Sequence, residues 1–169
     1  WQVIVIDDGS SDGTYTQACA GGVHTLRLDH NRGKGGALRH GLEHADGGII
    51  LFLDADLRAS ACEAHKLITP ILEDQVDVTI AKFKPRKAAP GGFGLVKALA
   101  FLSMRWFTGC KITSALSGQR ALKRSVLATI GPLPDGYGLE VGMLIDILKQ
   151  GYRVLEVDVD MCHDVTGRN

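Results

Sequence analysis

The sequence IILFLDAD at residues 49–56 places two aspartates directly after an uninterrupted apolar run. Such a run is typical of a strand that is buried on both faces and ends in a turn. In extended backbone, Asp54 and Asp56 point to the same side. Two convergent carboxylates suit a hard divalent cation, Mg²⁺ or Mn²⁺, and that cation can also hold a diphosphate. An ordinary acidic strand end has the same residues, so this motif does not by itself establish a site.

Further apolar runs alternate with helical patterns along the chain. Strands are predicted at residues 3–6, 23–28, 49–53, 76–81 and 152–161. Helices are predicted from about residue 12 and at residues 34–45, 60–74, 93–107, 121–130 and 139–150, with Ser60 and Glu63 as a capping box. The alternation predicts an α/β fold, with a Rossmann-like, mostly parallel sheet and helices on both faces. Ligands bind beyond the carboxyl ends of such strands, where both acidic turns, Asp7-Asp8 and Asp54-Ala55-Asp56, fall.

Composition limits the functional class. The 169 residues, 45% of them hydrophobic, are enough for one domain with a substantial core. Nineteen basic residues balance nineteen acidic ones, so no general field attracts nucleic acid, and any anion must be bound by a local site. A dinucleotide-binding dehydrogenase is disfavoured because no GxGxxG motif follows residues 3–6.

Cysteine usage and hydropathy bear on the compartment. The four cysteines are widely spaced without a zinc-binding pattern, which favours reduced, mostly buried thiols and a cytoplasmic location: Cys19, Cys62, Cys110 and Cys162. No signal peptide opens the chain, and the longest apolar stretch, residues 94–107, is interrupted by Lys97 and Arg105. The expectation is therefore a soluble or peripheral protein.

Three segments resemble, in order and spacing, the signature of family 2 glycosyltransferases, which have the GT-A fold. They are VIVIDDGSSDGT (residues 3–14), NRGKGGA (31–37) and DAD (54–56). The likeness is specific over residues 3–57 and continues more weakly through residues 116–121, 136–140 and 161–168. It is nearest to the glucosyl-3-phosphoglycerate synthases and the polyprenyl-phosphate sugar transferases. The resemblance implies transfer of a sugar from a nucleoside diphosphate carrier, with UDP as the expected nucleotide.

Five residues are expected to contact the nucleotide sugar: Asp7, Asp8, Lys34, Asp54 and Ala55. The resemblance assigns the first acidic turn to the nucleobase and ribose, although both aspartates could instead end a strand and cap a helix. Lys34 combines a positive charge with the free amides of a glycine-flanked helix start, which suits an anionic ligand. The alternative for Lys34 is a solvated surface lysine.

Metal binding and catalysis are assigned by the same resemblance. It implies that Asp56 is a metal ligand and a catalytic residue, that Asp54 contacts ribose or the metal through water, and that His163 supplies a third ligand. A histidine ligand favours Mn²⁺ over Mg²⁺. Glu140 is expected to face the acceptor hydroxyl, as general base in an inverting enzyme or as an orienting group in a retaining one. Its alternative is a glutamate that stabilises a helix N-terminus.

The acceptor wall in this resemblance consists of Ser117, Gly118, Gln119 and Arg120, with Arg168 placed to meet a phosphate. Arg120 and Lys123 are candidates to face a phosphorylated acceptor such as a phosphoglycerate; the alternative is that the helix predicted at residues 121–130 exposes them to water. Two alternatives remain: a polyprenyl-phosphate acceptor, which implies peripheral association with a membrane, and a nucleotide-sugar-binding module without turnover.

The sequence departs from the family at both ends. Residues 1–169 are expected to be one glycosyltransferase catalytic domain without the family's first strand, which lies between the strands at residues 3–6 and 49–53, and without the helices that close the acceptor side. A missing strand leaves two open edges. The gap closes by direct pairing, receives a strand from another chain or stays open. Low stability of the isolated chain or association into a homo-oligomer is therefore expected.

Overall fold

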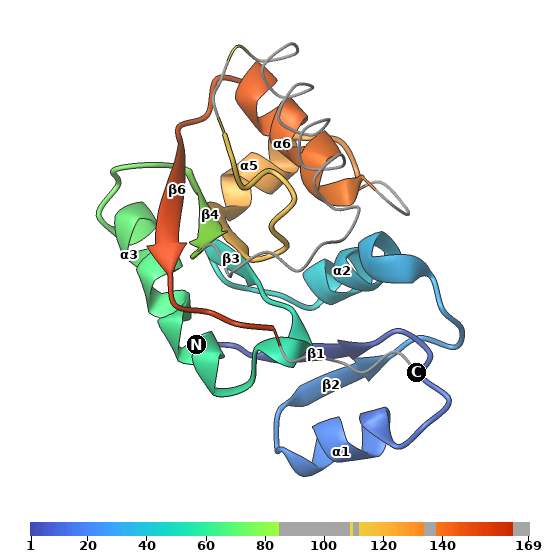
Figure 1. The fold of residues 1–169 in the computed structure, drawn as a ribbon. Helices are drawn as coiled ribbons and strands as arrows, with labels where there is room; N and C mark the ends of the chain where they lie inside the picture. Colours follow the sequence, from blue (N-terminus) through green and yellow to red (C-terminus); the bar gives the residue numbers. More distant parts are fainter. Residues whose placement is uncertain (85–108, 110–111, 134–137, 164–169) are drawn as a thin grey trace, which may run out of the picture.

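The computed structural model describes residues 1–84, 109, 112–133 and 138–163, and its strands form two sheets (Figure 1). The smaller sheet pairs β1 (Ile4–Asp7) with β2 (His24–Arg27) in parallel. The larger sheet has the strand order β3-β5-β4-β6, with β3 at Ile49–Phe52, β5 at Arg120–Lys123, β4 at Val78–Phe83 and β6 at Val154–Val159.

Helices cover both faces of the larger sheet, as predicted (Figure 1). The helices on the larger sheet are α2 (Gly33–Glu43), the 3₁₀ helix η1 (Ala55–Ala64), α3 (His65–Leu72), α5 (Arg124–Thr129) and α6 (Leu139–Lys149), whereas α1 (Thr14–Ala20) packs on the smaller sheet. One apolar cluster packs α5 and α6 against the sheet through residues such as Val126 and Leu144. The second cluster packs η1 and α3 against the opposite face through residues such as Leu57 and Leu67. These layers confirm the α/β architecture.

Strand β5 is where the structure differs most from the predicted elements. Residues 121–130 were expected to form one helix, but Arg120–Lys123 is a strand and only Arg124–Thr129 is helical. The strand runs antiparallel to both β3 and β4, so the sheet is mixed. Ala121 and Leu122 are completely buried between their neighbours. Four residues are too few for a period to be read, so the pairing of distant strands decides their conformation.

Strand β1 is half-buried at Ile4, Val5 and Ile6, whereas a strand buried on both faces was expected. In the described part of the chain β1 pairs only with β2, and β3 pairs only with β5. Direct pairing of β1 with β3, one of the three predicted outcomes, is therefore absent from these sheets. Contacts through α2 hold the small sheet instead: a Cβ on Gly41 would lie 2.7 Å from Cδ1 of Ile6. The Gln2 side chain also bonds the backbone of His44 and Asp46, at 2.9 and 2.8 Å.

The predicted capping box of Ser60 and Glu63 does not form, because both side chains bind the segment after β6. Ser60 Oγ accepts a hydrogen bond from the Cys162 amide at 3.1 Å. Glu63 Oε2 accepts one from the Asp160 amide, also at 3.1 Å. The backbone turns sharply at Arg58, whose φ is +47°. These contacts join η1 to the exit of β6, which determines where His163 lies.

Three further expectations can be compared with the structure. Cys19, Cys62 and Cys162 are free thiols as expected but exposed rather than buried, and Cys110 lies outside the described residues. The helix predicted at residues 93–107 also lies outside them. Among the helices that the structure describes, none has the length and apolarity needed to cross a membrane.

Candidate metal and nucleotide-sugar site

Asp54, Asp56 and His163 form a cluster at the carboxyl ends of strands of the larger sheet. Asp54 comes two residues after β3, Asp56 lies in the first turn of η1, and His163 comes soon after β6. One ligand atom from each lies within 4.8 Å of the others, and His163 Nδ1 is 2.8 Å from Asp56 Oδ1. Adjacent ligands of an octahedral cation are ~3 Å apart when the bonds are about 2.1 Å long. Two carboxylates and one imidazole at this spacing therefore fit a divalent cation such as Mg²⁺ or Mn²⁺.

The His163 ring is held by more than its partner Asp56. Phe83, at the end of β4, stacks on it with ring centroids 5.2 Å apart and an interplanar angle of 26°. The neighbouring Cys162 is bonded to Ser60, as described above. The side chains of Asp54, Asp56 and His163 remain 31%, 35% and 42% exposed. The cluster is thus positioned by the fold and open to a ligand.

Lys34 connects Asp54 to Glu140. It lies in the first turn of α2, and its Nζ is 2.9 Å from Asp54 Oδ1 and 2.9 Å from Glu140 Oε1. Partial burial disfavours the ammonium, but hydrogen bonds to the two carboxylates outweigh it and raise the pKa of Lys34 above its usual value. Gln119 Nε2 donates to the other oxygen, Asp54 Oδ2, at 2.5 Å. Asp54 is engaged at both oxygens, whereas the described contacts of Asp56 involve Oδ1, so Asp56 is better placed than Asp54 as a direct metal ligand.

Gly118 gives Lys34 and Asp54 the room to meet. A Cβ on Gly118 would lie 2.5 Å from Lys34 Nζ and 3.0 Å from Asp54 Oδ2. The first distance is shorter than real Cβ contacts and the second is unusually tight, so any other side chain would displace the Lys34 ammonium and crowd the Asp54 carboxylate. The Gly118 backbone thus forms the floor under this ion pair.

These residues border a cleft of about 550 Å³, a size typical of ligand sites. Its lining consists of Lys34, Asp54, residues 81–83, residues 113–119 and His163. Three of the four predicted acceptor-wall residues, Ser117, Gly118 and Gln119, are among them. Arg168 lies outside the described residues.

Arg120 does not line this cleft, in contrast to the expectation that it faces an acceptor. The residue is 1% exposed, and its guanidinium donates to the carbonyls of Glu140, Ala115 and Ser117 at 3.0, 3.4 and 2.5 Å. Burial lowers its pKa to about 10, opposed by the charges of Glu140 and Asp54, so it stays positive at neutral pH. Arg120 therefore holds the wall in place from behind. Lys123 does not line the cleft either, because its ammonium donates hydrogen bonds to Asp74 and Asp77.

Glu156 is a site-supporting residue that sequence reasoning missed. Its carboxylate accepts hydrogen bonds from the amides of Thr113 and Ser114 at 2.9 and 2.6 Å and from the Thr113 hydroxyl at 3.0 Å. These bonds attach one wall of the cleft to β6. The alternating pattern of β6 shows that Glu156 lies on its polar face, but nothing local indicates its partners.

The first acidic turn has one inward and one outward aspartate. The Asp7 side chain, which was expected to bind the nucleobase, is only 1% exposed. Its Oδ2 lies 3.3 Å from Arg27 Nε. Asp8 is half-buried, and its Oδ1 accepts a hydrogen bond from the Arg32 amide at 2.7 Å, just before α2. Gly9, with a φ of +71°, lies so close to His30 that a Cβ would be 2.7 Å from the His30 carbonyl carbon. Of the two aspartates, Asp8 is the more accessible to a nucleotide.

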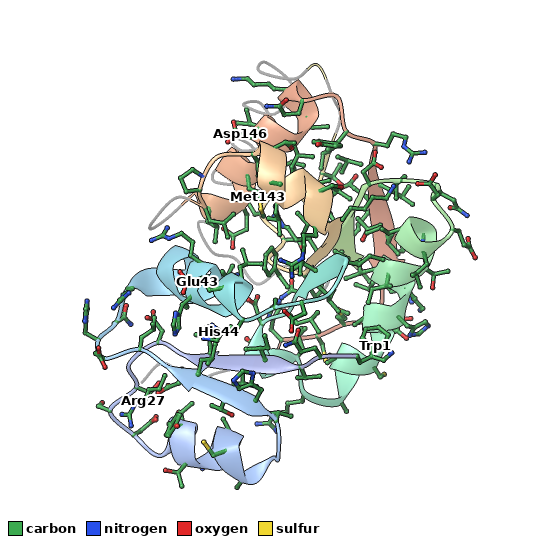
Figure 2. All side chains as sticks on the ribbon, turned by 180° about the vertical axis from the view of Figure 1, so that it is seen from behind. Trp1, Arg27, Glu43, His44, Met143 and Asp146 are labelled. Atoms are coloured by element: carbon green, nitrogen blue, oxygen red, sulfur yellow. The ribbon has the colours of Figure 1, made fainter. Side chains whose placement is uncertain are left out.

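A second hollow, of about 370 Å³, adjoins this turn and is lined by Arg27, Leu28 and Asp29 (Arg27 is labelled in Figure 2). The Arg27 guanidinium lies 5.1 Å from the centre of the Tyr15 ring and donates to the Ser10 carbonyl at 2.9 Å. The hollow thus begins where β1 and β2 end.

Comparison with known proteins places this geometry in a family. The family model "Glycosyl transferase family 2" matches residues 1–131. The chain is 30% identical over 163 residues to glycosyltransferase AglJ of Haloferax volcanii, covering 92% of this chain and 52% of that protein. It is 26% identical to dolichyl-phosphate beta-glucosyltransferase of Saccharomyces cerevisiae, covering 99% and 58%. The chain spans about half the length of the curated relatives that it matches.

Solved structures agree with the sequence relatives. Glucosyl-3-phosphoglycerate synthase of Mycobacterium tuberculosis is 30% identical over 166 residues, covering 86% of this chain and 51% of that protein. Its crystal structure in complex with Mn²⁺, UDP and phosphoglyceric acid superposes with a TM-score of 0.81 at 27% identity, covering 98% of this chain and 61% of that one. Another structure of the same enzyme contains Mg²⁺ and UDP, with a TM-score of 0.79, 26% identity and coverage of 97% and 60%.

Proposed function

The chain belongs to glycosyl transferase family 2, and from this membership we propose that it transfers a sugar from a UDP-sugar to a phosphorylated acceptor in a metal-dependent reaction. The observation that carries the proposal is the single network at the carboxyl end of β3. It joins a metal-type cluster, Asp54, Asp56 and His163, through Lys34 to the candidate base Glu140. A cluster that only ended a strand would not need a lysine shared with a second carboxylate.

The proposed roles follow from the positions of the side chains. Asp56 and His163 would hold Mg²⁺ or Mn²⁺, with Asp54 beside them. Bound there, the cation supplies positive charge to the departing diphosphate. Lys34 carries a second positive charge at the start of α2, whose first turn contains no acidic residue, and the positive end of the helix dipole adds to it. Glu140 would accept the proton of the acceptor hydroxyl, or orient that hydroxyl if the reaction retains configuration.

The metal proposal is tested by binding of UDP in the presence of Mn²⁺, measured by calorimetry. We expect Asp56→Asn to abolish metal-dependent UDP binding. Asp158→Asn is the matched control, because this aspartate is 74% exposed and pairs with Lys82 at 3.5 Å on the surface of β6. UDP affinity that is equal in the Asp56→Asn and control proteins would remove Asp56 from the metal site.

For the acceptor we propose a small phosphorylated acid such as a phosphoglycerate. The support is the likeness to the M. tuberculosis enzyme, whose structure was solved with phosphoglyceric acid, together with a cleft that includes Lys34 and Lys82. The test compares UDP release with 3-phosphoglycerate and with unphosphorylated glycerate. Faster release with the phosphorylated compound alone is expected, and equal release with both would exclude recognition of the phosphate.

A second candidate acceptor is a polyprenyl phosphate, favoured by the likeness to the yeast dolichyl-phosphate enzyme over 99% of this chain. It implies a peripheral association with membranes that a phosphoglycerate would not require. Release of UDP stimulated by dolichyl phosphate in vesicles, but not by 3-phosphoglycerate, would favour this candidate. UDP binding without acceptor-stimulated release would instead indicate a nucleotide-sugar-binding module. The cytoplasmic location remains a prediction from the cysteine pattern.

A further inference from the structure

A second cluster of metal-binding side chains lies at the opposite end of α2 from Lys34. It contains His40, Glu43 and His44, and one ligand atom from each lies within 4.8 Å of the others. Figure 2 shows Glu43 and His44 where α2 meets the sheet of β1 and β2. None of these residues contributes to the site described above, which lies at the other end of the helix. The cluster therefore needs its own explanation.

The two histidines are presented as metal ligands usually are. Residues four apart share one face of a helix, so both rings project on the same side. His44 Nδ1 is 3.0 Å from the His40 carbonyl, and because a carbonyl only accepts, this nitrogen carries the proton and Nε2 holds the lone pair. His40 Nδ1 is 3.1 Å from Glu43 Oε2, which assigns its proton in the same way. Metal-bound histidines commonly donate their second nitrogen to a carbonyl or carboxylate.

A third ring comes from a different element. His24 is the first residue of β2, and its ring meets that of His44 edge-on with centroids 6.1 Å apart. The His40 and His44 rings are 5.0 Å apart in a similar edge-on arrangement. Two imidazoles on one zinc ion have centroids roughly 5–6 Å apart, because the Zn–N bonds are about 2.0–2.1 Å long. The His40 and His44 rings are already at this spacing, and the His24 ring lies just beyond it, 6.1 Å from that of His44.

We propose that His40 and His44 bind a divalent transition cation of the zinc class, with the Glu43 carboxylate orienting His40 and with His24 moving in from β2 as a further ligand when the ion binds. Imidazole nitrogen suits Zn²⁺, whereas Mg²⁺ strongly prefers oxygen, so this site and the aspartate site select different ions. The bound ion would connect α2 to β2. In the described chain the β1-β2 sheet has no strand pairing to the larger sheet, so a metal-mediated contact here would stabilise the attachment of the small sheet to α2.

The experiment is a calorimetric titration of the whole chain with ZnCl₂. The Asp56→Asn background removes the first site, and alkylation of the thiols with iodoacetamide prevents zinc binding to the exposed cysteines. We expect one zinc ion per chain and a higher melting temperature. His44→Gln should lower the zinc affinity at least about 100-fold and abolish the rise in melting temperature. Glu43→Gln, at a carboxylate that is 69% exposed, should lower affinity about 10–100-fold without disturbing the fold.

The matched control is His65→Gln. His65 also places Nδ1 near a helix carbonyl, at 2.8 Å from Cys62 O, but it is not part of the cluster. This variant should keep the parent affinity and melting temperature. The proposal is overturned if zinc affinity is unchanged in both the His44→Gln and Glu43→Gln variants, or if His65→Gln reduces it equally. The readout is independent of sugar transfer, so the proposal does not depend on the proposed function.

Discussion

At the scale of single residues, a substitution at Gly118 is expected to change the geometry of the site without changing the stability of the fold. A Cβ at this position would meet the flexible end of Lys34 and the carboxylate of Asp54, not the buried core. We therefore expect Gly118→Ala to leave the melting temperature nearly unchanged while it lowers UDP-sugar turnover at least about 10-fold, since misplaced catalytic groups are costly. Gly131→Ala is the control, because no atom of the described residues lies within 4 Å of a Cβ there. Full activity in the Gly118→Ala variant would show that the space at Gly118 is not needed to hold Lys34 and Asp54 in place.

His163 is the second residue whose effect can be predicted. Removing its imidazole takes one ligand from the cluster but leaves Asp56 and its position at the end of β3. We expect His163→Ala to weaken Mn²⁺-dependent UDP binding by about 10–100-fold, the range typical of a disturbed metal site. Titration of UDP at saturating and at zero Mn²⁺ checks this. The binding without metal should be the same in both proteins, and a loss that is equal under both conditions would show that His163 acts on the nucleotide directly.

At the scale of elements, one carboxylate connects three neighbouring strands. Asp77, just before β4, accepts hydrogen bonds from the Lys123 ammonium at the end of β5 and from Arg153, just before β6. Hydrogen bonds from Arg153, with help from Lys123, hold the pKa of Asp77 well below its ordinary value despite some burial. The contribution of Asp77 to stability is therefore complete above the unfolded pKa, about 3.9. It is lost progressively as the pH falls from there toward the lower folded pKa.

Because the pKa of Asp77 is lowered in the folded state, the effect of removing its charge on stability should depend on pH. At pH 7, Asp77→Asn should lower the free energy of unfolding by about 1 kcal/mol, the usual effect of a lost charged hydrogen bond in a partly exposed network. The difference between variant and parent should shrink below about pH 4, where the unfolded parent chain becomes protonated. Urea unfolding at several pH values measures it. Asp158→Asn, at an exposed partner of Lys82, should match the parent throughout. A difference that is constant down to pH 2 would exclude the ionisation of Asp77 as its cause.

At the scale of the whole molecule, β1 and β3 each pair with a single strand in the described part of the chain. Edge strands with apolar side chains are templates for pairing with another chain. Trp1 and Val3, beside β1, are 95% and 58% exposed. We predict that the 169-residue chain associates as its concentration rises.

Light scattering after size-exclusion chromatography tests the association. Val3→Lys places a charge at the exposed edge and should shift association to higher concentration. Leu72→Lys removes a comparably exposed apolar residue, 70% accessible, from α3 and should have little effect. A chain that remains monomeric at all concentrations would show that the open edges have no such consequence.

The sequence by itself determined the features that depend on local pattern. Apolar runs marked β1, β3 and β4 to within about two residues, and the acidic turns placed Asp8, Asp54 and Asp56 at strand ends. The glycine-rich start of α2 indicated Lys34 as a ligand-facing cation, and the structure brings it to Asp54. The predictions of strands and strand ends succeeded because periodicity and strand termination are properties of neighbouring residues, whereas the role of Lys34 toward a ligand stays a prediction.

Only the tertiary structure decided the long-range arrangement. His163 meets Asp56 across 107 positions because the segment after β6 is bonded to η1, and no local signal encodes that contact. Arg120 is buried, not exposed to the acceptor, because β5 inserts between β3 and β4 and turns its guanidinium toward backbone carbonyls. Whether a charged side chain faces a ligand or supports a wall depends on which strands become neighbours. That choice is made by the packing of the whole chain.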